Sequence, residues 1–439
     1  MDALPVVVVG AGPVGLAAAA ELLERGVEPV VLERGAQAGA AVAQWRHVRL
    51  FSPWSELVAP AAGRLLATRG WHRPAPDTYP TGGDWVDRYL RPLADALGAR
   101  VRVDAEVVGV AREGRDRVVD AGRDDTPLTV HVRTGGGEER VTARAVIDAS
   151  GTWGTPGPVG GDGLPALGEA AAGARITYRI PDLDDPHVRA RYAGRHVAVV
   201  GSGHSAQTAL VALGGLARTA PQTRVSWILR RGAPDAAFGG DDDQLPERGA
   251  LGRRARRAAQ DGHVDIVPGF RTAAVAPTGD ALTLVSGDGR RVAAVDEVVA
   301  LTGLRPDLSW LSELRLDLDT VLQAPVALAP LIDPNVHSCG TVPPHGVREL
   351  AHPEPGVYLV GMKSYGRAPT FLALTGYEQV RSIAADIAGD RAAAERVELH
   401  LPETGMCGGA GVFDAAAGGG GCCGPAVAEV LSVPVSATR

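Results

Sequence analysis

The sequence lacks the features that would assign it to several large classes of protein. It has only four cysteines, and they form no spaced framework of the kind that staples small secreted domains, so we expect a reducing, cytoplasmic setting. No run of 18 uncharged apolar residues occurs, which argues against a membrane span. A net charge of −7 does not supply the basic surface that nucleic-acid binding needs. We therefore expect neither a membrane nor a nucleic-acid partner.

Glycine is abundant, and one glycine-rich loop follows the clearest strand pattern. The β-branched run Val6–Val9 predicts a strand buried on both faces of a parallel sheet. The loop 10–15 (GAGPVG) comes next, then an expected helix over 16–25 and a strand over 29–32 that ends at Glu33. This order of strand, loop, helix, strand and acid is typical of a dinucleotide-binding βαβ unit.

The residues of this first loop suit a pyrophosphate. Gly10 permits the tight turn, Gly12 lets the backbone approach the phosphates, and Gly15 lets the helix pack closely on the strand. The helix N-terminus adds free N–H groups and a partial positive charge. Glu33 can accept both ribose hydroxyls and would repel a 2′-phosphate, which favours FAD. The FAD contacts predicted from this unit are Gly10, Gly12, Pro13, Val14, Gly15, Glu33 and Arg34.

A second unit of the same kind begins near residue 196. A strand over 196–200 is followed by the loop 201–206 (GSGHSA), a helix over 207–216 and a strand over 225–229. Arg230 and Arg231 stand where the first unit has an acid, and two guanidinium groups suit a 2′-phosphate, which favours NADPH. The predicted NADPH contacts are Gly201, Gly203, Ser205, Ala206, Arg230, Arg231, Thr302 and Gly303.

Later segments are predicted to complete the FAD domain. Residues 105–107 would end a strand that reaches the adenine, and 145–151 and 356–361 would be buried strands. A helix over 369–388 would direct its N-terminus toward the flavin. The further FAD contacts predicted from these regions and from the loop after the first unit are Trp45, Val107, Ala149, Ser150, Gly151, Gly361 and Thr370. His345 and His352 flank the last of these segments; either could donate a proton near the flavin, but a position in a surface loop is favoured.

The order of these segments predicts an α/β protein in which one Rossmann-type domain is inserted into another. The FAD-binding domain would comprise 1–158 and 310–400, and the NADPH-binding domain 159–309. Residues 401–439 are rich in glycine and cysteine and are expected to form a flexible tail.

These motifs resemble the flavin-containing monooxygenase family, over residues 6 to about 389. The segments HVRLFSPW (47–54), YPTGGDWVDRYL (79–90) and MKSYGRAPTFLALTGYEQVRS (362–382) most resemble flavin-binding monooxygenases associated with arsenic-resistance operons. The resemblance implies that NADPH reduces FAD and that the reduced flavin reacts with O2. The family usually places an asparagine in the loop that here reads LFSPW (50–54), and none is present. Residues 150–153 (SGTW) also lack the phenylalanine and histidine typical of ketone oxygenation.

The cysteines leave the chemistry open. No CxxC or CxxxxC motif follows the first loop or lies in the second domain, which disfavours dithiol chemistry at the flavin. The tail carries Cys407 and the adjacent pair Cys422 and Cys423, whose thiols could bind trivalent arsenic or reach the flavin. No metal site of four spaced ligands is expected. Catalytic residues are not assigned; the candidates are Lys363, Tyr365, Arg367, Cys422 and Cys423.

We therefore expect an FAD- and NADPH-dependent oxidoreductase that acts on a small molecule with O2. The favoured activity is oxygenation of a soft nucleophile, namely a thiol, a thioether or a trivalent arsenic species. The first alternative is an NADPH-dependent reductase or oxidase that uses the tail cysteines. The second is a metalloid-binding flavoprotein without turnover. A homodimer is left open.

Overall fold

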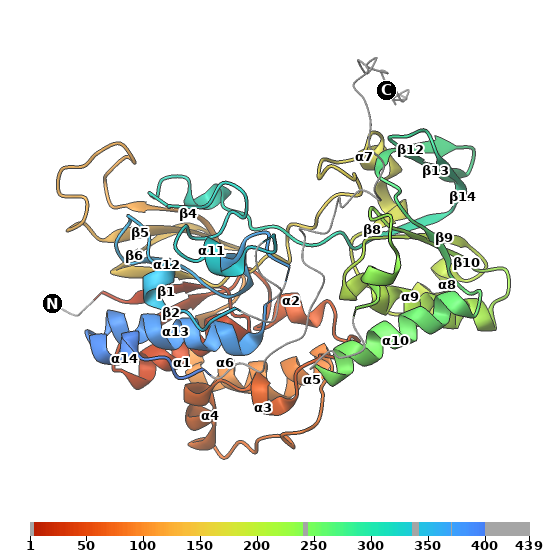
Figure 1. Cartoon of the computed structure of the whole chain (residues 1–439). Helices are drawn as coiled ribbons and strands as arrows, with labels where there is room; N and C mark the ends of the chain where they lie inside the picture. Colours follow the sequence, from red (N-terminus) through yellow and green to blue (C-terminus); the bar gives the residue numbers. More distant parts are fainter. Residues whose placement is uncertain (1–3, 240–244, 336–341, 370, 400–439) are drawn as a thin grey trace. The chain divides into compact units, whose positions relative to one another are not determined.

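The computed structural model describes most of the chain, namely residues 4–239, 245–335, 342–369 and 371–399. Contacts divide these residues into two units: unit 1 runs up to Thr155 and resumes at Leu304, and unit 2 is Pro156–Gly303. Each unit is an α/β structure built on a five-stranded parallel sheet (Figure 1). The predicted fold class is therefore confirmed, with one Rossmann-type unit interrupting the sequence of another.

The parallel sheet of unit 1 has the strand order β16-β7-β1-β2-β3. Its central strand β1 (Val6–Val9) pairs in parallel with β2 (Pro29–Leu32) and with β7 (Ala145–Asp148). All four side chains of β1 are buried, because helices or a second sheet cover both faces. The outer strands are β16 (Val357–Leu359) and β3 (Val101–Arg102).

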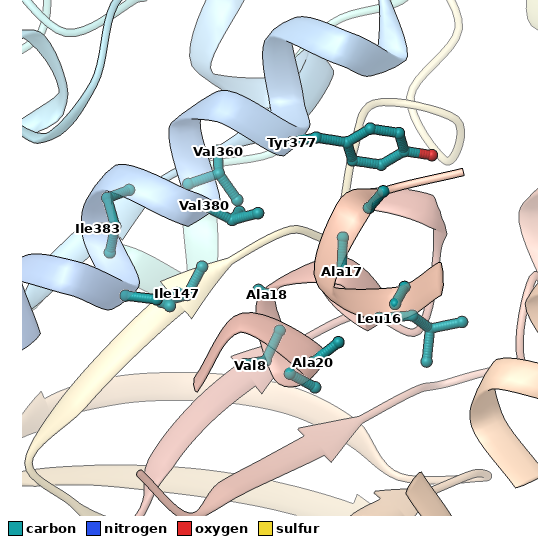
Figure 2. Packing of buried hydrophobic residues seen from close by; sticks show 14 of the residues in the cluster. Val8, Leu16, Ala17, Ala18, Ala20, Ile147, Val360, Tyr377, Val380 and Ile383 are labelled. Atoms are coloured by element: carbon teal, nitrogen blue, oxygen red, sulfur yellow. The ribbon is translucent and has the colours of Figure 1, made fainter. Parts of the chain in front are cut away.

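Helix α1 (Pro13–Glu24) packs on one face of this sheet, and α13 (Ala373–Ile387) packs against α1. The alanines of α1 are small enough for both contacts, and eight of its residues are buried. Tyr377, Val380 and Ile383 of α13 belong to the same apolar cluster (Figure 2). This packing fixes where the first glycine-rich loop lies, since the loop leads directly into α1.

The other face of the unit 1 sheet is covered by an antiparallel sheet of β4 (Glu106–Arg112), β5 (Leu128–Thr134) and β6 (Gly137–Ala143). Further helical segments of this unit are α2 (Ala40–Ala43), α3 (Trp54–Leu57), α4 (Pro60–Ala67), α5 (Gly82–Trp85), η1 (Val86–Leu90), α6 (Arg91–Leu97), η2 (Gly98–Arg100), η5 (Ser309–Leu311), α11 (Ala329–Ile332), α12 (Val347–Leu350), η6 (Gly361–Tyr365) and α14 (Arg391–Glu395).

Two predictions about this unit need correction. The segment 105–107 does not end a strand of the parallel sheet: β3 ends at Arg102, and Val107 lies near the start of β4 in the antiparallel sheet. The helix predicted over 369–388 begins at Ala373 and not at Pro369. Phe371, between those two positions, instead packs edge-on against Tyr365, with ring centroids 5.0 Å apart. Tertiary contact therefore overrides the helix start that the proline suggested.

Unit 2 has its parallel sheet in the order β11-β10-β9-β15-β8. These strands are β8 (Ile176–Thr177), β9 (His196–Val200), β10 (Arg224–Ile228), β11 (Asp265–Val267) and β15 (Glu297–Ala300). Helix α9 (His204–Thr219) follows β9 after the loop 201–203 and packs against α10 (Pro246–Gln260). The remaining segments described here are α7 (Glu169–Ala172), η3 (Gly173–Arg175), α8 (Pro186–Tyr192), α9 (His204–Thr219), η4 (Asp235–Ala237), α10 (Pro246–Gln260), β12 (Thr272–Thr278), β13 (Ala281–Ser286) and β14 (Arg291–Val295).

None of the described helices combines the length and the apolar character needed to cross a membrane.

Candidate cofactor sites

The first glycine-rich loop joins the end of β1 to the start of α1 at the carboxyl edge of the unit 1 sheet. Gly10 has a φ of +98°, and a Cβ there would lie 2.9 Å from the carbonyl oxygen of Ala149. A Cβ on Gly15 would lie 1.9 Å from the carbonyl oxygen of Gly10. A Cβ on Gly12 would meet no described atom within 4 Å. Gly10 and Gly15 are thus required by the packing of the protein itself, whereas Gly12 faces open space.

That open space lies at the N-terminus of α1. The helix has Gly12 as its N-cap, which provides no side-chain cap, and Pro13 in its first turn. Backbone N–H groups at a helix start are not bonded within the helix, and they carry a partial positive charge. The loop therefore provides what a pyrophosphate needs, namely unobstructed backbone, free donors and a favourable dipole.

Glu33 connects this loop to the turn after β2. Its Oε2 accepts a hydrogen bond from the N–H of Ala11, and its Oε1 accepts one from the N–H of Gly35, both at 2.8 Å. The side chain is buried, and these bonds hold the carboxylate at the edge of the loop. Each carboxylate oxygen has a second lone pair, so it can still accept a hydroxyl. A phosphate at this position would meet a negative charge.

The turn after β7 contains a buried ion pair. Asp148 Oδ1 accepts hydrogen bonds from the Ser150 N–H at 3.0 Å and hydroxyl at 2.6 Å. Asp148 Oδ2 lies 2.6 Å from Lys363 Nζ, and both side chains have zero exposure. Nζ also donates to Ser150 Oγ at 3.1 Å, and it lies 4.6 Å from the ring centroid of Trp310. The candidate Lys363 is thus enclosed and paired at the turn that adjoins Gly10.

The second loop has the same construction in unit 2. Gly201 has a φ of +129°, and a Cβ there would lie 2.2 Å from the carbonyl oxygen of Leu301. A Cβ on Gly203 would meet no atom within 4 Å in the described chain, and Gly203 is the N-cap of α9 without a side-chain cap. Ala206 is fully buried beneath the helix, and Ser205 is exposed at its first turn. The structure therefore repeats the open helix N-terminus.

Arg230 and Arg231 follow the end of β10, next to this second loop in the sheet. Arg230 is exposed, and its Nη1 donates to the carbonyl oxygen of Gly161 at 3.2 Å. The carbonyl of Arg231 accepts a hydrogen bond from the N–H of Gly269 at 2.7 Å. Thr302 Oγ1 donates to the carbonyl oxygen of Gly157 at 2.8 Å. Positive charge thus stands at the strand tip where unit 1 has Glu33.

The other predicted contact residues lie at several places in unit 1. The Trp45 ring packs against Gly82, where a Cβ would lie 2.7 Å from its Cε3. The Arg34 guanidinium lies against Gly154, where a Cβ would be 2.7 Å from Nη2. Val107 is half-buried in β4 and packs beneath the parallel sheet.

Two catalytic candidates differ in their surroundings. Tyr365 is 3% exposed, and burial raises the pKa of its hydroxyl. Arg367 is exposed and donates from Nε to Gln323 Oε1 at 2.8 Å. The remaining predicted residues, namely Thr370, Cys407, Cys422 and Cys423, lie outside the described residues.

A buried polar chain beside the Gly361 turn has no counterpart in the sequence predictions. Gln379 Oε1 accepts a hydrogen bond from the N–H of Gly361 at 2.8 Å. Its Nε2 donates to Ser364 Oγ and to His345 Nε2, both at 2.9 Å. His345 is 3% exposed, so the expectation of a surface histidine was wrong; burial lowers its pKa. No local pattern marks these partners, since His345 and Gln379 lie 34 residues apart.

Among the described residues, no group of three or more His, Cys, Asp or Glu side chains could hold a metal ion.

Comparison with known proteins places this geometry in a family. A family model described as pyridine nucleotide-disulphide oxidoreductase matches residues 7–327, more than half of the chain. The bacillithiol disulfide reductase of Bacillus cereus superposes with a TM-score of 0.63 over 88% of this chain and 99% of that chain, at 20% identity. A mutant flavin monooxygenase from Stenotrophomonas maltophilia superposes with a TM-score of 0.59 over 89% of this chain and 99% of that chain, at 26% identity.

A curated relative, the indole-3-pyruvate monooxygenase YUCCA1 of Oryza sativa subsp. japonica, is 31% identical over 199 residues. That match covers 45% of this chain and 42% of the relative, so less than half of the relative is matched.

The chain belongs to the pyridine nucleotide-disulphide oxidoreductase family. It is therefore an oxidoreductase, and its structural neighbours include both reductases and flavin monooxygenases.

Proposed function

We propose that this protein is an NADPH-dependent flavin monooxygenase that oxidises a soft nucleophile, namely a thiol, a thioether or a trivalent arsenic species. The observation that carries the cofactor assignment is the opposite charge beside the two loops. Glu33 stands at the first loop, which suits the ribose of FAD, and Arg230 and Arg231 stand at the second, which suits the 2′-phosphate of NADPH. We accordingly assign FAD to unit 1, which ends at Thr155 and resumes at Leu304, and NADPH to unit 2, Pro156–Gly303.

The residues of unit 1 fit FAD. Gly12 leaves room for a pyrophosphate at the N-terminus of α1, and the amides of the first turn would donate hydrogen bonds to it. The remaining lone pairs of the Glu33 carboxylate would accept hydrogen bonds from the ribose hydroxyls. The segments 149–151 and 361–365 flank the same loop, and we expect them to line the rest of the site.

The bound cofactors supply hydride transfer from NADPH and the activation of O2. Overall, substrate, O2, NADPH and a proton yield the oxygenated substrate, water and NADP⁺. One oxygen atom enters the substrate, and NADPH provides the two electrons that convert the other to water. The protein holds the cofactors and orients them.

Two observations favour oxygenation over dithiol chemistry. The sequence has no CxxC or CxxxxC motif after the first loop or in the second domain, the places where dithiol flavoproteins carry one. The flavin monooxygenase of Stenotrophomonas maltophilia is 26% identical to this chain over nearly all of its own length. Similarity to arsenic-operon flavoproteins, carried by segments such as 362–382, supports a soft nucleophile as substrate.

The proposal is tested by following ¹⁸O₂ through turnover. The purified holoprotein is incubated with NADPH and, separately, a thiol, a thioether and arsenite. We expect ¹⁸O in the oxidised product and one NADPH consumed for each product formed. Hydrogen peroxide formed in equal amount to NADPH, with no labelled product from any of the three substrates, would overturn the oxygenase assignment.

The same preparation separates the alternatives. Under nitrogen, NADPH should bleach the flavin absorbance; failure to do so would favour a binding protein without turnover. The variant Cys422→Ser/Cys423→Ser should retain both bleaching and product formation. Retained bleaching with loss of turnover would instead favour a reductase that uses the tail thiols.

A further inference from the structure

The ion pair between Asp148 and Lys363 is a costly feature that the fold alone does not require. Both side chains have zero exposure, and removing two charges from water carries a large desolvation penalty. Replacement of such a pair by apolar residues is often neutral or stabilising. A buried pair of this kind therefore suggests a role in holding a defined geometry.

The pair links two segments that flank the first glycine-rich loop. Asp148 ends β7, and its Oδ1 holds the Ser150 turn through two hydrogen bonds. The next residue, Ala149, has its carbonyl oxygen where it excludes any side chain from Gly10. The turn after β7 thus determines how closely the chain approaches the loop.

Lys363 approaches from the other side of the same loop. It lies in η6, which begins at Gly361, and a Cβ on Gly361 would lie 3.3 Å from Val14 in the first turn of α1. The backbone also ties the two segments, because the N–H of Val360 donates to the carbonyl oxygen of Asp148 at 3.0 Å. The Lys363 ammonium adds the side-chain bridge to Asp148 and Ser150, and Trp310 packs over its Nζ.

We propose that Lys363 is a positioning residue for FAD. Through its ion pair with Asp148, Lys363 holds the segments 149–151 and 361–365 in place around the first loop. This inference rests on the assignment of FAD to unit 1. Lys363 is enclosed, so it acts through the two segments and not as an acid, a base or a substrate ligand. Without the bridge, the two segments would be free to separate. FAD would then have to order them when it binds, which would weaken its affinity.

The test removes the bridge without leaving an isolated buried charge. In Asp148→Asn/Lys363→Met, the amide oxygen of Asn can still accept the bonds from Ser150, so only the link to η6 is lost. The apoprotein is titrated with FAD by flavin fluorescence, and its unfolding midpoint in urea is measured. We expect the FAD dissociation constant to rise at least tenfold. Lys363→Arg, which keeps the charge and the pairing with Asp148, should bind FAD more tightly than the double variant.

A second buried ion pair in the same unit provides the matched control. Glu378 and Arg381 pair at 2.7 Å on α13, and Arg381 also donates to the carbonyl of Ala393. The variant Glu378→Gln/Arg381→Met should shift the unfolding midpoint while its FAD dissociation constant stays within twofold of wild type. Equal weakening of FAD binding in both double variants would mean that Lys363 contributes only general stability, and would overturn the proposal.

The remaining outcomes are also decisive. An FAD dissociation constant within twofold of wild type in the folded Asp148→Asn/Lys363→Met variant overturns the role of Lys363 while leaving the proposed function intact. Failure of the wild-type apoprotein to bind FAD overturns the proposed function itself. If the double variant does not fold, Trp310→Leu uncovers the ammonium and should raise the dissociation constant about threefold; an unchanged value contradicts the proposal.

Discussion

Glycines of the first loop differ in what they can tolerate. Gly15 packs so closely against the Gly10 carbonyl that no side chain fits. A larger residue at Gly15 would therefore force the backbone to shift. Gly12 has a φ of −80°, which any residue can adopt, and it faces open space. Gly15 is therefore required for the packing of the protein, whereas Gly12 is expected to matter for ligand binding.

We predict opposite effects for alanine at these two sites. Gly15→Ala should lower the free energy of unfolding of the apoprotein by about 1–3 kcal/mol, as overpacking does. Gly12→Ala should leave that free energy unchanged but weaken FAD binding, because its Cβ occupies the space expected for the pyrophosphate. Urea unfolding and FAD titration of both apoproteins check this. Unchanged FAD binding in Gly12→Ala would contradict the assigned site.

At the second loop, Arg230 and Arg231 should determine the choice of dinucleotide. Arg230→Ser/Arg231→Ser should raise KM for NADPH at least tenfold and leave KM for NADH nearly unchanged, because only NADPH carries the 2′-phosphate. Steady-state kinetics with both dinucleotides measures this. Arg291→Ser, an exposed arginine of β14, is the control and should change neither value. Equal losses for the two dinucleotides would refute a phosphate-specific role.

His352 should make stability depend on pH. Burial lowers its pKa to about 4, from 6.5, while its Nδ1 accepts a hydrogen bond from the Asp317 N–H. Below pH 6.5 the unfolded chain gains a proton that the folded chain does not, so stability should fall between pH 6.5 and about 4, by up to about 3 kcal/mol. His352→Gln should flatten this slope in urea unfolding at pH 4 to 7.5. The exposed His72→Gln is the control; an equal effect in both would contradict the prediction.

At the scale of elements, α13 meets α1 at Gly376, where a Cβ would collide with neighbouring side chains. A Cβ on Gly376 would lie 2.6 Å from Val14 Cγ2 and 3.0 Å from Phe371 Cζ. The contact brings the start of α13 to the first turn of α1, where the first loop ends. Separation of these helices would therefore disturb both the core and the loop.

We predict that Gly376→Ala lowers the free energy of unfolding by about 1–3 kcal/mol through this collision, despite the better helix propensity of alanine. Val14→Ala in the same chain should restore part of the loss, since it removes the opposing methyl groups. A double-mutant cycle on the apoprotein, measured by urea unfolding, gives the coupling energy. Strictly additive effects would mean that the two residues do not oppose each other.

For the whole molecule, the chain enters and leaves unit 2 at adjacent points. The N–H of Gly157 donates to the carbonyl oxygen of Gly303 at 2.8 Å, while in unit 1 the N–H of Arg305 donates to the carbonyl oxygen of Thr155 at 2.9 Å. Each unit also has apolar clusters of its own, with those around β9 and β10 lying entirely within unit 2. These are the conditions for an insertion that folds by itself.

We predict that residues 156–303, expressed alone, unfold cooperatively and bind NADP⁺ more tightly than NAD⁺. Joining Thr155 to Leu304 through a short Gly/Ser linker should leave a unit 1 that still binds FAD. Circular dichroism on heating and calorimetric titration measure both pieces. A fragment 156–303 without a cooperative transition would contradict the independence of the units.

Much of the fold could be predicted because local residue patterns suffice for it. The buried valines of β1, the glycine spacing and the helix after it form one continuous segment of chain, and the structure has them nearly as expected. The same reasoning holds for unit 2, where β9, the second loop and α9 follow one another as expected. The positions of Glu33 after β2 and of Arg230 and Arg231 after β10 could be predicted in the same way, from their spacing to the glycine-rich loops.

The sequence by itself determined the two glycine-rich loops, their order and the charges beside them, because each of these features depends on residues that are close together along the chain. Only the tertiary structure decided that Lys363 meets Asp148, that Gln379 meets His345, and that Val107 belongs to a second sheet. Asp148 and Lys363 are brought together by the pairing of β7 with β16, over 200 residues apart along the chain. A pairing of strands, and not any local pattern, brings such side chains together.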